Sequence, residues 1–181
     1  MKHLGTRNLS TKRLVLRRIR MSDAEAMFQN WAHDPEVTKY LTWTPHESVE
    51  TTKKLIKKWV TDYKDPEAYL WAITLRTNLD RPIGTISVVE LSRVAPCCEV
   101  GYALGRPWWN QGYATEALSA CIGALFALGF TAVNAGFFEG NIASRRVMEK
   151  SGMCSAYRTH EIEYRGETRR CIYFTITAEE K

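Results

Sequence analysis

The sequence predicts an α/β fold in which helices cover both faces of a mixed β-sheet. Three observations carry this prediction. Strand-like runs are followed along the chain by the order strand, helix, strand, helix, strand. The chain has 181 residues, of which 45% are hydrophobic, so it can bury a substantial core. A length of this order predicts one domain, over residues 1–181.

The first part of the chain predicts one strand and one helix. Over 12–20, Leu14, Leu16 and Ile19 can face inward around Arg17-Arg18, a pattern typical of a strand with one buried face. The segment Ser22-Asp23-Ala24-Glu25 has the pattern of a capping box, with which a helix begins. That helix should end near His33, because Pro35 disfavours helical geometry in the residue before it.

A second helix and a hairpin are expected next. Apolar residues recur at steps of three and four over 48–63, while lysines fall towards the outer side, as in an amphipathic helix. Residues 69–76 and 83–91 have the composition of strands. The polar segment 78–82, which is closed by a proline, predicts the turn between them.

The remaining chain predicts alternating strands and helices. The expected elements are a strand over 97–104, a helix over 112–128, a strand over 132–138, a helix over 141–151 and two strands around a turn at Arg165-Gly166. Gly129 and Gly152 stand where the two helices should end, since glycine readily adopts the left-handed conformation of a C-terminal cap.

Composition narrows the classes of function. The net charge of +5 and the pI near 9.0 favour anionic ligands, but the basic residues are spread along the chain, so direct binding of nucleic acid is not predicted. No stretch is apolar enough to span a membrane, and the N-terminus lacks the pattern of a signal peptide, so we expect a cytoplasmic protein. The spacing of cysteines and other ligand residues predicts reduced thiols and no metal site.

The strongest candidate for a binding site is the segment Trp108–Leu118, where an apolar strand turns through Gly112 into a long helix. The first N–H groups of a helix lack internal partners and lie at the positive end of its dipole, so they readily bind a phosphate. Gly112 and Ala114 leave room for an anion near the backbone. The alternative is an ordinary corner between a strand and a helix.

Several separated segments resemble the GNAT family of acyl-CoA N-acyltransferases. They are Glu99-Val100-Gly101-Tyr102, Trp109 to Ala117, Asn141-Ile142-Ala143-Ser144 and Glu149-Lys150-Ser151-Gly152-Met153. More narrowly, three segments resemble the ribosomal-protein alanine N-acetyltransferase branch: residues 11–17, Asp34-Pro35-Glu36-Val37-Thr38 and Trp109 to Ala117. The resemblance implies a mostly antiparallel central sheet of about seven strands, in which the strands over 97–104 and 132–138 splay apart and hold the acyl-CoA.

The resemblance also implies which residues bind acetyl-CoA, the expected co-substrate. The backbone amides of five consecutive residues should hold its pyrophosphate: Gln111, Gly112, Tyr113, Ala114 and Thr115. The other expected contacts are Tyr102, Leu104, Asn141, Ser144 and Arg146. The family usually has Gln or Arg where this chain has Trp109, a departure that leaves binding by main-chain groups intact. The alternatives are that Asn141 only caps its helix and that Arg146 is simply an exposed helix residue.

Glu99 is the candidate for activating the amine. In a strand it shares one face with Gly101 and Ala103, so its carboxylate would lie above a floor of small residues. The alternative is a half-exposed glutamate paired with an arginine. An α-amine, with a pKa of about 8, needs a weaker base than a lysine, with a pKa of about 10.4.

Protonation of the leaving thiolate is assigned to Ser144. Many GNAT proteins have a tyrosine acid where this chain has Met148, which cannot donate a proton. The segment 152–156 also lacks a glutamate that some members of the branch possess. A thiolate can leave unaided as well, since its pKa lies not far above neutral.

The predicted reaction is transfer of an acetyl group from acetyl-CoA to a primary amine by direct attack. The resemblance favours a protein N-terminal α-amine, for instance that of a ribosomal protein. Two alternatives remain: acetylation of a small amine such as an antibiotic or a polyamine, and an acyl-CoA-binding module without turnover. Because family members often dimerise, a homodimer is also anticipated.

Overall fold

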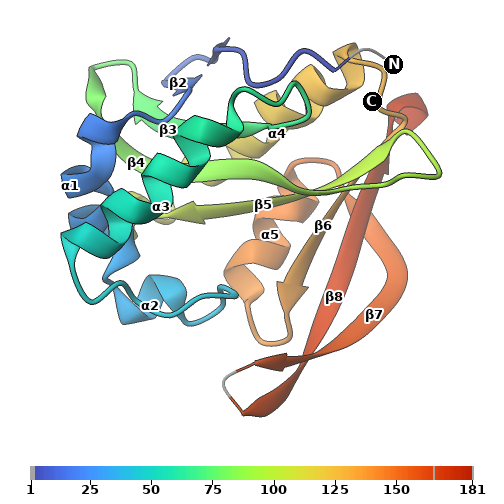
Figure 1. The fold of residues 1–181 in the computed structure, drawn as a ribbon. Helices are drawn as coiled ribbons and strands as arrows, with labels where there is room; N and C mark the ends of the chain where they lie inside the picture. The colour runs from blue at the N-terminus through green and yellow to red at the C-terminus, as the bar shows by residue number, and fades with distance from the viewer. Residues whose placement is uncertain (1–2, 165, 181) are drawn as a thin grey trace.

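Eight strands form one sheet in the computed structural model, which describes residues 3–164 and 166–180 (Figure 1). They are β1 (Leu9–Ser10), β2 (Leu14–Arg17), β3 (Leu70–Leu75), β4 (Asn78–Leu91), β5 (Cys97–Leu104), β6 (Ala132–Phe138), β7 (Cys154–Tyr164) and β8 (Glu167–Thr177). Their order is β1-β2-β3-β4-β5-β6-β8-β7, and all neighbours are antiparallel except β5 and β6. The predicted mixed sheet is confirmed, with one strand more than expected.

Helices cover both faces of this sheet, as predicted. They are α1 (Ala24–Met27), α2 (Pro35–Thr38), α3 (Val49–Asp62), α4 (Tyr113–Ala127) and α5 (Ile142–Lys150). Helices α4 and α5 pack together on one face, and α1 and α3 pack together on the other (Figure 1). Because successive side chains of a strand point to opposite faces, Trp71 and Ile73 join the core beneath α4, whereas Ala72 joins the core beneath α3.

The first strand is shorter than predicted, and the first helix is divided. β2 covers only four residues of the expected 12–20, and β1 has two residues, too few for any periodicity to indicate. The expected helix over 22–33 consists of a 3₁₀ turn at Met21–Asp23, then α1, then a π-helical turn at Phe28–Ala32. Its end before His33 agrees with the prediction.

The predicted cap at Ser22 is wrong, because the neighbouring Asp23 takes the capping contacts. The Asp23 carboxylate accepts the Arg20 backbone N–H at 2.7 Å and forms an ion pair with Arg17 at 2.8 Å. Both side chains of that pair are almost fully buried, at 4% exposure for Arg17 and 1% for Asp23. Arg17 also donates to the carbonyl of Leu79, so the pair joins β2, β4 and the first helical turns.

The predicted turn at 78–82 is also wrong, because these residues belong to β4 and the chain turns at 76–77. The pairing of β3 with β4 shifts register between Ile73 and Leu75, where Pro82 lies opposite Thr74. A proline is tolerated in a strand at such an irregularity, since it has no N–H to donate to the ladder.

The other elements lie where the sequence predicts them. Ser48 and Asn141 cap α3 and α5 with their side chains, and Gly129 and Gly152 follow α4 and α5 in left-handed conformations, with φ of 95° and 87°. The final two strands are confirmed, whereas Arg165 of the predicted turn lies outside the described residues. Within the described part of the chain, no helix combines the length and the apolar character needed to cross a bilayer.

The parallel strands β5 and β6 pair over only part of their length, and this feature positions the site. Their partners are Cys97 with Ala132, Cys98 with Val133 and Glu99 with Asn134. Between the described residues of the two strands no further pair forms, although β5 continues to Leu104 and β6 to Phe138. The predicted separation of these two strands is therefore present (Figure 1).

Candidate functional site

The turn into α4 presents its backbone to solvent. Gly112 is the N-cap of α4 with a φ of 78°, and Asn110 also has a positive φ, of 58°. The Glu116 N–H donates to the Gly112 carbonyl at 3.0 Å, so the amides of Tyr113, Ala114 and Thr115 come before the first full helical bond. Residues 111 and 112 are exposed, and residues 113–115 are half-buried. The corner thus lies at the surface of the molecule rather than in the core.

Trp109 helps to shape this turn. Its indole N–H donates to the backbone carbonyl of Leu104 at 2.7 Å, and the Gln111 side chain donates to the carbonyl of Pro107 at 2.7 Å. The carbonyl of Leu104, a predicted cofactor contact, is therefore occupied by Trp109, and the Leu104 side chain belongs to the core.

Arg13, from the N-terminal part of the chain, binds both this turn and Glu116 in the first turn of α4. The Glu116 carboxylate accepts from Thr11 Oγ1 (2.6 Å), from the Arg13 backbone N–H (2.8 Å) and from Arg13 Nε (2.7 Å). Arg13 Nη1 donates to the Gln111 carbonyl at 2.9 Å. The sequence analysis missed this contribution. Arg13 lies within the segment 11–17 that carries the family resemblance, but no spacing rule connects it to Glu116.

Tyr102 and Ser144 meet across the opening between β5 and β6. Tyr102 lies on β5 beyond the last β5–β6 pair, and its hydroxyl is 2.8 Å from Ser144 Oγ on the first turn of α5. Desolvation raises the pKa of Tyr102 to about 12, which keeps the phenol protonated near neutral pH. Asn141 accepts the Ser144 N–H at 3.1 Å, so its predicted capping role is present.

A cavity of about 800 Å³ contains these groups and continues along the face covered by α3. Glu99, Tyr102, Asn141 and Ser144 all line it. Aromatic side chains from several elements form much of its remaining wall, among them Trp43, Trp59, Phe138 and Tyr173. The structure thus brings both predicted catalytic residues, Glu99 and Ser144, and the predicted contacts Tyr102 and Asn141 into one cavity next to the parted strands.

Glu99 lies on the cavity wall with 20% of its side chain exposed. Burial raises the pKa of this carboxyl, and the nearby Glu90 raises it further, whereas Arg158 opposes the shift. Arg158 Nη2 is 3.8 Å from Glu99 Oε2, and its guanidinium lies 4.0 Å from the centre of the Tyr173 ring. The glutamate–arginine pair considered as an alternative therefore exists, at the long end of ion-pair distances.

The other predicted cofactor contacts do not line this cavity: they are Leu104, the turn 111–115 and Arg146. Arg146 is exposed on α5 and does not line the cavity. Met148, at the position of the expected acid, is 1% exposed within the core. Among the described residues, no group of three or more His, Cys, Asp or Glu side chains is placed to hold a metal ion.

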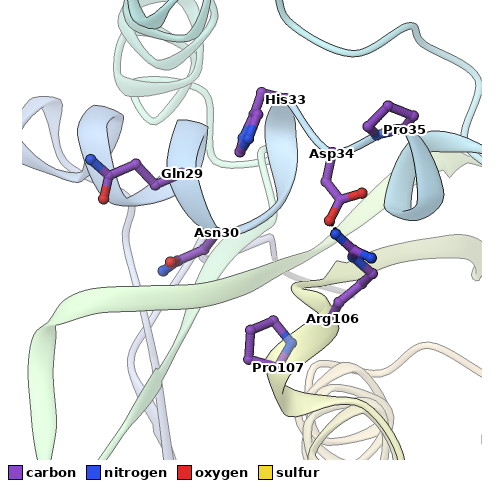
Figure 2. A pocket seen from close by; sticks show the side chains of 7 residues that line it. All are labelled: Gln29, Asn30, His33, Asp34, Pro35, Arg106 and Pro107. Atoms are coloured by element: carbon purple, nitrogen blue, oxygen red, sulfur yellow. Dashed lines mark hydrogen bonds and ion pairs between the residues drawn. The ribbon is translucent and has the colours of Figure 1, made fainter.

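A smaller pocket, of about 300 Å³, separates the first helical turns from the end of β5 (Figure 2). Asp34 and Arg106 point toward each other across it and form an ion pair at 2.5 Å. Asp34 also caps α2 by accepting the Glu36 N–H. This pair ties the segment around α2 to the start of the loop that leads into α4.

Comparison with known proteins identifies relatives along most of the chain. The sequence model of the Acetyltransferase (GNAT) domain family matches residues 13–154. The uncharacterised N-acetyltransferase YoaA of Bacillus subtilis (strain 168) is 34% identical over 145 residues, which cover 80% of this chain and 81% of YoaA.

Two solved structures share the fold at 16% identity each. The ribosomal L7/L12 α-N-protein acetyltransferase RimL, solved with coenzyme A, superposes with a TM-score of 0.81 over 97% of this chain and 100% of RimL. The microcin C7 self-immunity acetyltransferase MccE, solved with acetyl-CoA and AMP, superposes with a TM-score of 0.81 over 92% of this chain and 93% of MccE.

Proposed function

This chain belongs to the GNAT acetyltransferase family and is an acetyl-CoA-dependent N-acyltransferase, and from that premise we propose that its acceptor is the N-terminal α-amine of a protein. The observation that carries the proposal is the position of Glu99, a half-buried carboxylate on the wall of an open cavity beside the parted strands. The likeness in fold to RimL, an α-N-protein acetyltransferase, is consistent with it.

In the proposed mechanism, Glu99 removes the proton of the incoming amine. The raised pKa of Glu99 lies nearer to the pKa of an α-amine, which makes Glu99 a better base than an exposed glutamate. The neutral amine attacks the thioester carbonyl carbon, a C–N bond forms, and the C–S bond breaks. The attacking nitrogen loses one further proton as the amide forms, which balances the proton that the leaving sulfur takes up. No covalent intermediate with the enzyme is required.

The turn into α4 is proposed to hold the diphosphate of acetyl-CoA through the amides of Gln111, Gly112, Tyr113, Ala114 and Thr115. The open backbone there and the positive end of the α4 dipole support this assignment. Tyr102, Asn141 and Ser144 would line the path of the pantetheine arm. Arg146, exposed on α5, would reach the 3′-phosphate, and Leu104 would contribute through its backbone at most.

Ser144 is proposed to protonate the leaving sulfur. The Tyr102 hydroxyl lies 2.8 Å from Ser144 Oγ and donates to the Ser144 carbonyl at 3.2 Å. A phenol is the stronger acid of the two hydroxyls, so in the proposed step Tyr102 turns its proton to Ser144 Oγ as the serine proton passes to the thiolate. Met148 is buried in the core and has no proton to donate, whereas the Tyr102–Ser144 pair lines the same cavity as Glu99.

The size of the cavity supports a small amine as a second candidate acceptor. Its volume, about 800 Å³, lies within the range of sites that enclose small molecules. Aromatic walls suit an organic cation as well as a peptide.

A free-thiol assay with acetyl-CoA separates these candidates. The panel contains peptides with free N-termini, the same peptides with blocked N-termini and one internal lysine, an aminoglycoside and spermidine. We expect release of CoA only with the free N-termini, and mass spectrometry should locate the acetyl group on the α-nitrogen. Turnover of the small amines alone would replace the first proposal by the second.

A further inference from the structure

Arg13, in the turn between β1 and β2, contacts both sides of the corner at which α4 begins. Its Nε donates to the carboxylate of Glu116, in the first turn of the helix, and its Nη1 donates to the carbonyl of Gln111, which precedes the helix. Its guanidinium also lies 4.3 Å from the centre of the Tyr113 ring. One side chain thus joins three consecutive parts of the turn.

The turn needs such support because its backbone is unfavourable. The cost lies at Asn110, whose φ of 58° crowds an L-residue against its own carbonyl, whereas Gly112 adopts its φ of 78° without that cost. The Gln111 carbonyl, which accepts the Arg13 bond, lies between these two residues. Arg13 therefore holds the peptide group that directly precedes Gly112 and the amides of the first helical turn.

Arg13 also compensates the charge of Glu116. Burial raises the pKa of this carboxyl, but the hydrogen bonds from Thr11 and Arg13, together with the charge of Arg13, outweigh burial and lower it overall. Glu116 is therefore ionised at neutral pH, in the first turn of α4. Without Arg13, its negative charge would repel an anion at the start of the helix.

We infer that Arg13 is a positioning residue for the co-substrate, which holds the 110–115 turn in its diphosphate-binding shape and neutralises Glu116. The inference rests on the diphosphate site of the proposed function. It assigns no contact between Arg13 and the ligand. The planar guanidinium is needed, because lysine would keep the charge but could not bond Glu116 and Gln111 in the same plane.

Two probes distinguish this role from general stabilisation of the fold. Coenzyme A carries the diphosphate, whereas pantetheine lacks both the diphosphate and the nucleotide. We would measure the affinity of each by calorimetry, with pantetheine as a competitor up to millimolar concentration. The proteins are the wild type, Arg13→Ala and Arg13→Lys.

Arg13→Ala should weaken binding of coenzyme A about tenfold or more, the size expected for loss of charge-assisted hydrogen bonds. Its affinity for pantetheine should stay within about twofold of the wild type, since the strand opening is untouched. Arg13→Lys should recover only part of the loss. Should Arg13→Ala fail to fold, Arg13→Lys decides the test by the same comparison.

Arg20→Ala is the matched control, because the ion pair between Arg20 and Asp80 spans 3.6 Å and both side chains are exposed. It should change neither affinity. If Arg13→Ala and Arg13→Lys retain the wild-type preference for coenzyme A over pantetheine, the inference is overturned while the diphosphate site stands. If the wild type itself shows no such preference, the proposed diphosphate site fails and the inference with it.

Discussion

At the scale of single residues, Glu99 is set apart by where it lies along its strand. It forms the last pair between β5 and β6, so the sheet opens directly after it. Burial and the neighbouring Glu90 both raise the pKa of its carboxyl. The pairing with β6 thus places the Glu99 carboxyl at the edge of the opening, and Glu90 on β4 contributes to its raised pKa.

Glu99→Gln should lower kcat/KM about 100-fold at pH 7, the usual size of a general-base contribution. The deficit should narrow above pH 8, where an α-amine loses its proton unaided. A pH–rate profile with a peptide acceptor checks this, and an unaltered profile removes Glu99 from the mechanism.

Glu90→Gln is the control for this profile. Since the charge of Glu90 raises the pKa of Glu99, its removal should lower that pKa and move the acid limb of kcat/KM to lower pH. The rate at pH 7 should stay close to that of the wild type.

The hydroxyl pair of Tyr102 and Ser144 makes a second prediction at this scale. Ser144→Ala should reduce kcat about tenfold, within the lower range of general-acid effects, and Tyr102→Phe should reduce it less, because the serine proton remains. Affinity for coenzyme A should change little in Tyr102→Phe. Equal rates for wild type and both variants would mean that the thiolate leaves without help.

Residues of the candidate site differed in how well sequence could indicate them. Glu99 and Ser144 lie in short local segments with a recognisable order, and the structure brings both to one cavity. Arg13 and Arg158 act on the site from distant segments, 103 positions from Glu116 in the case of Arg13. Such pairings depend on the final packing of strands and helices, which no local spacing encodes.

At the scale of elements, the caps of α3 and α5 form a natural pair. Ser48 accepts the Thr51 N–H and Asn141 accepts the Ser144 N–H, each through its side chain. Asn141 also lines the cavity, whereas Ser48 does not.

Alanine at either cap should cost about 1 kcal/mol of unfolding free energy, which urea denaturation measures. Only Asn141→Ala should also weaken coenzyme A binding, because only that cap faces the proposed cofactor path. If both variants bind coenzyme A as the wild type does, Asn141 is a helix cap and nothing more.

Elements with strong periodicity and clear end signals were predictable. α3, α4 and α5 lie within a residue or two of their expected bounds, since glycine, serine and asparagine mark their ends. The hairpin turn was misplaced because a register shift lets Pro82 remain inside β4. The divided first helix escaped prediction because Asp23 bonds to Arg17 and Arg20 rather than serving a regular helix.

At the scale of the whole molecule, one buried ion pair joins the sheet to the first helical turns. Arg17 and Asp23 connect the end of β2 to the first helical turns, and Arg17 also bonds the Leu79 carbonyl at the start of β4. Removing one partner would leave the other charge buried without compensation.

Asp23→Asn should therefore lower the free energy of unfolding by about 3–5 kcal/mol. Asp80→Asn, which alters a pair that is exposed, should change it by less than about 1 kcal/mol. Thermal and urea unfolding of both variants provide the comparison, and equal small losses would show that Arg17 finds another partner.

The overall class of fold followed from element order, and the comparisons agree with it. The shape of the cavity could not be predicted, because Trp43 and its neighbours come from an irregular segment between α2 and α3. That segment carries no periodicity from which its path could be inferred.

Only the three residue pairs between β5 and β6 join the two parts of the sheet, one of which contains β1 to β5 and the other β6 to β8. In the proposed complex, the pantetheine arm of acetyl-CoA lies between these two parts, and its amide groups can form hydrogen bonds of the kind that a strand would form there. Binding of acetyl-CoA should therefore restrict the motion of the two parts relative to each other, so that amide hydrogen exchange slows in both β5 and β6.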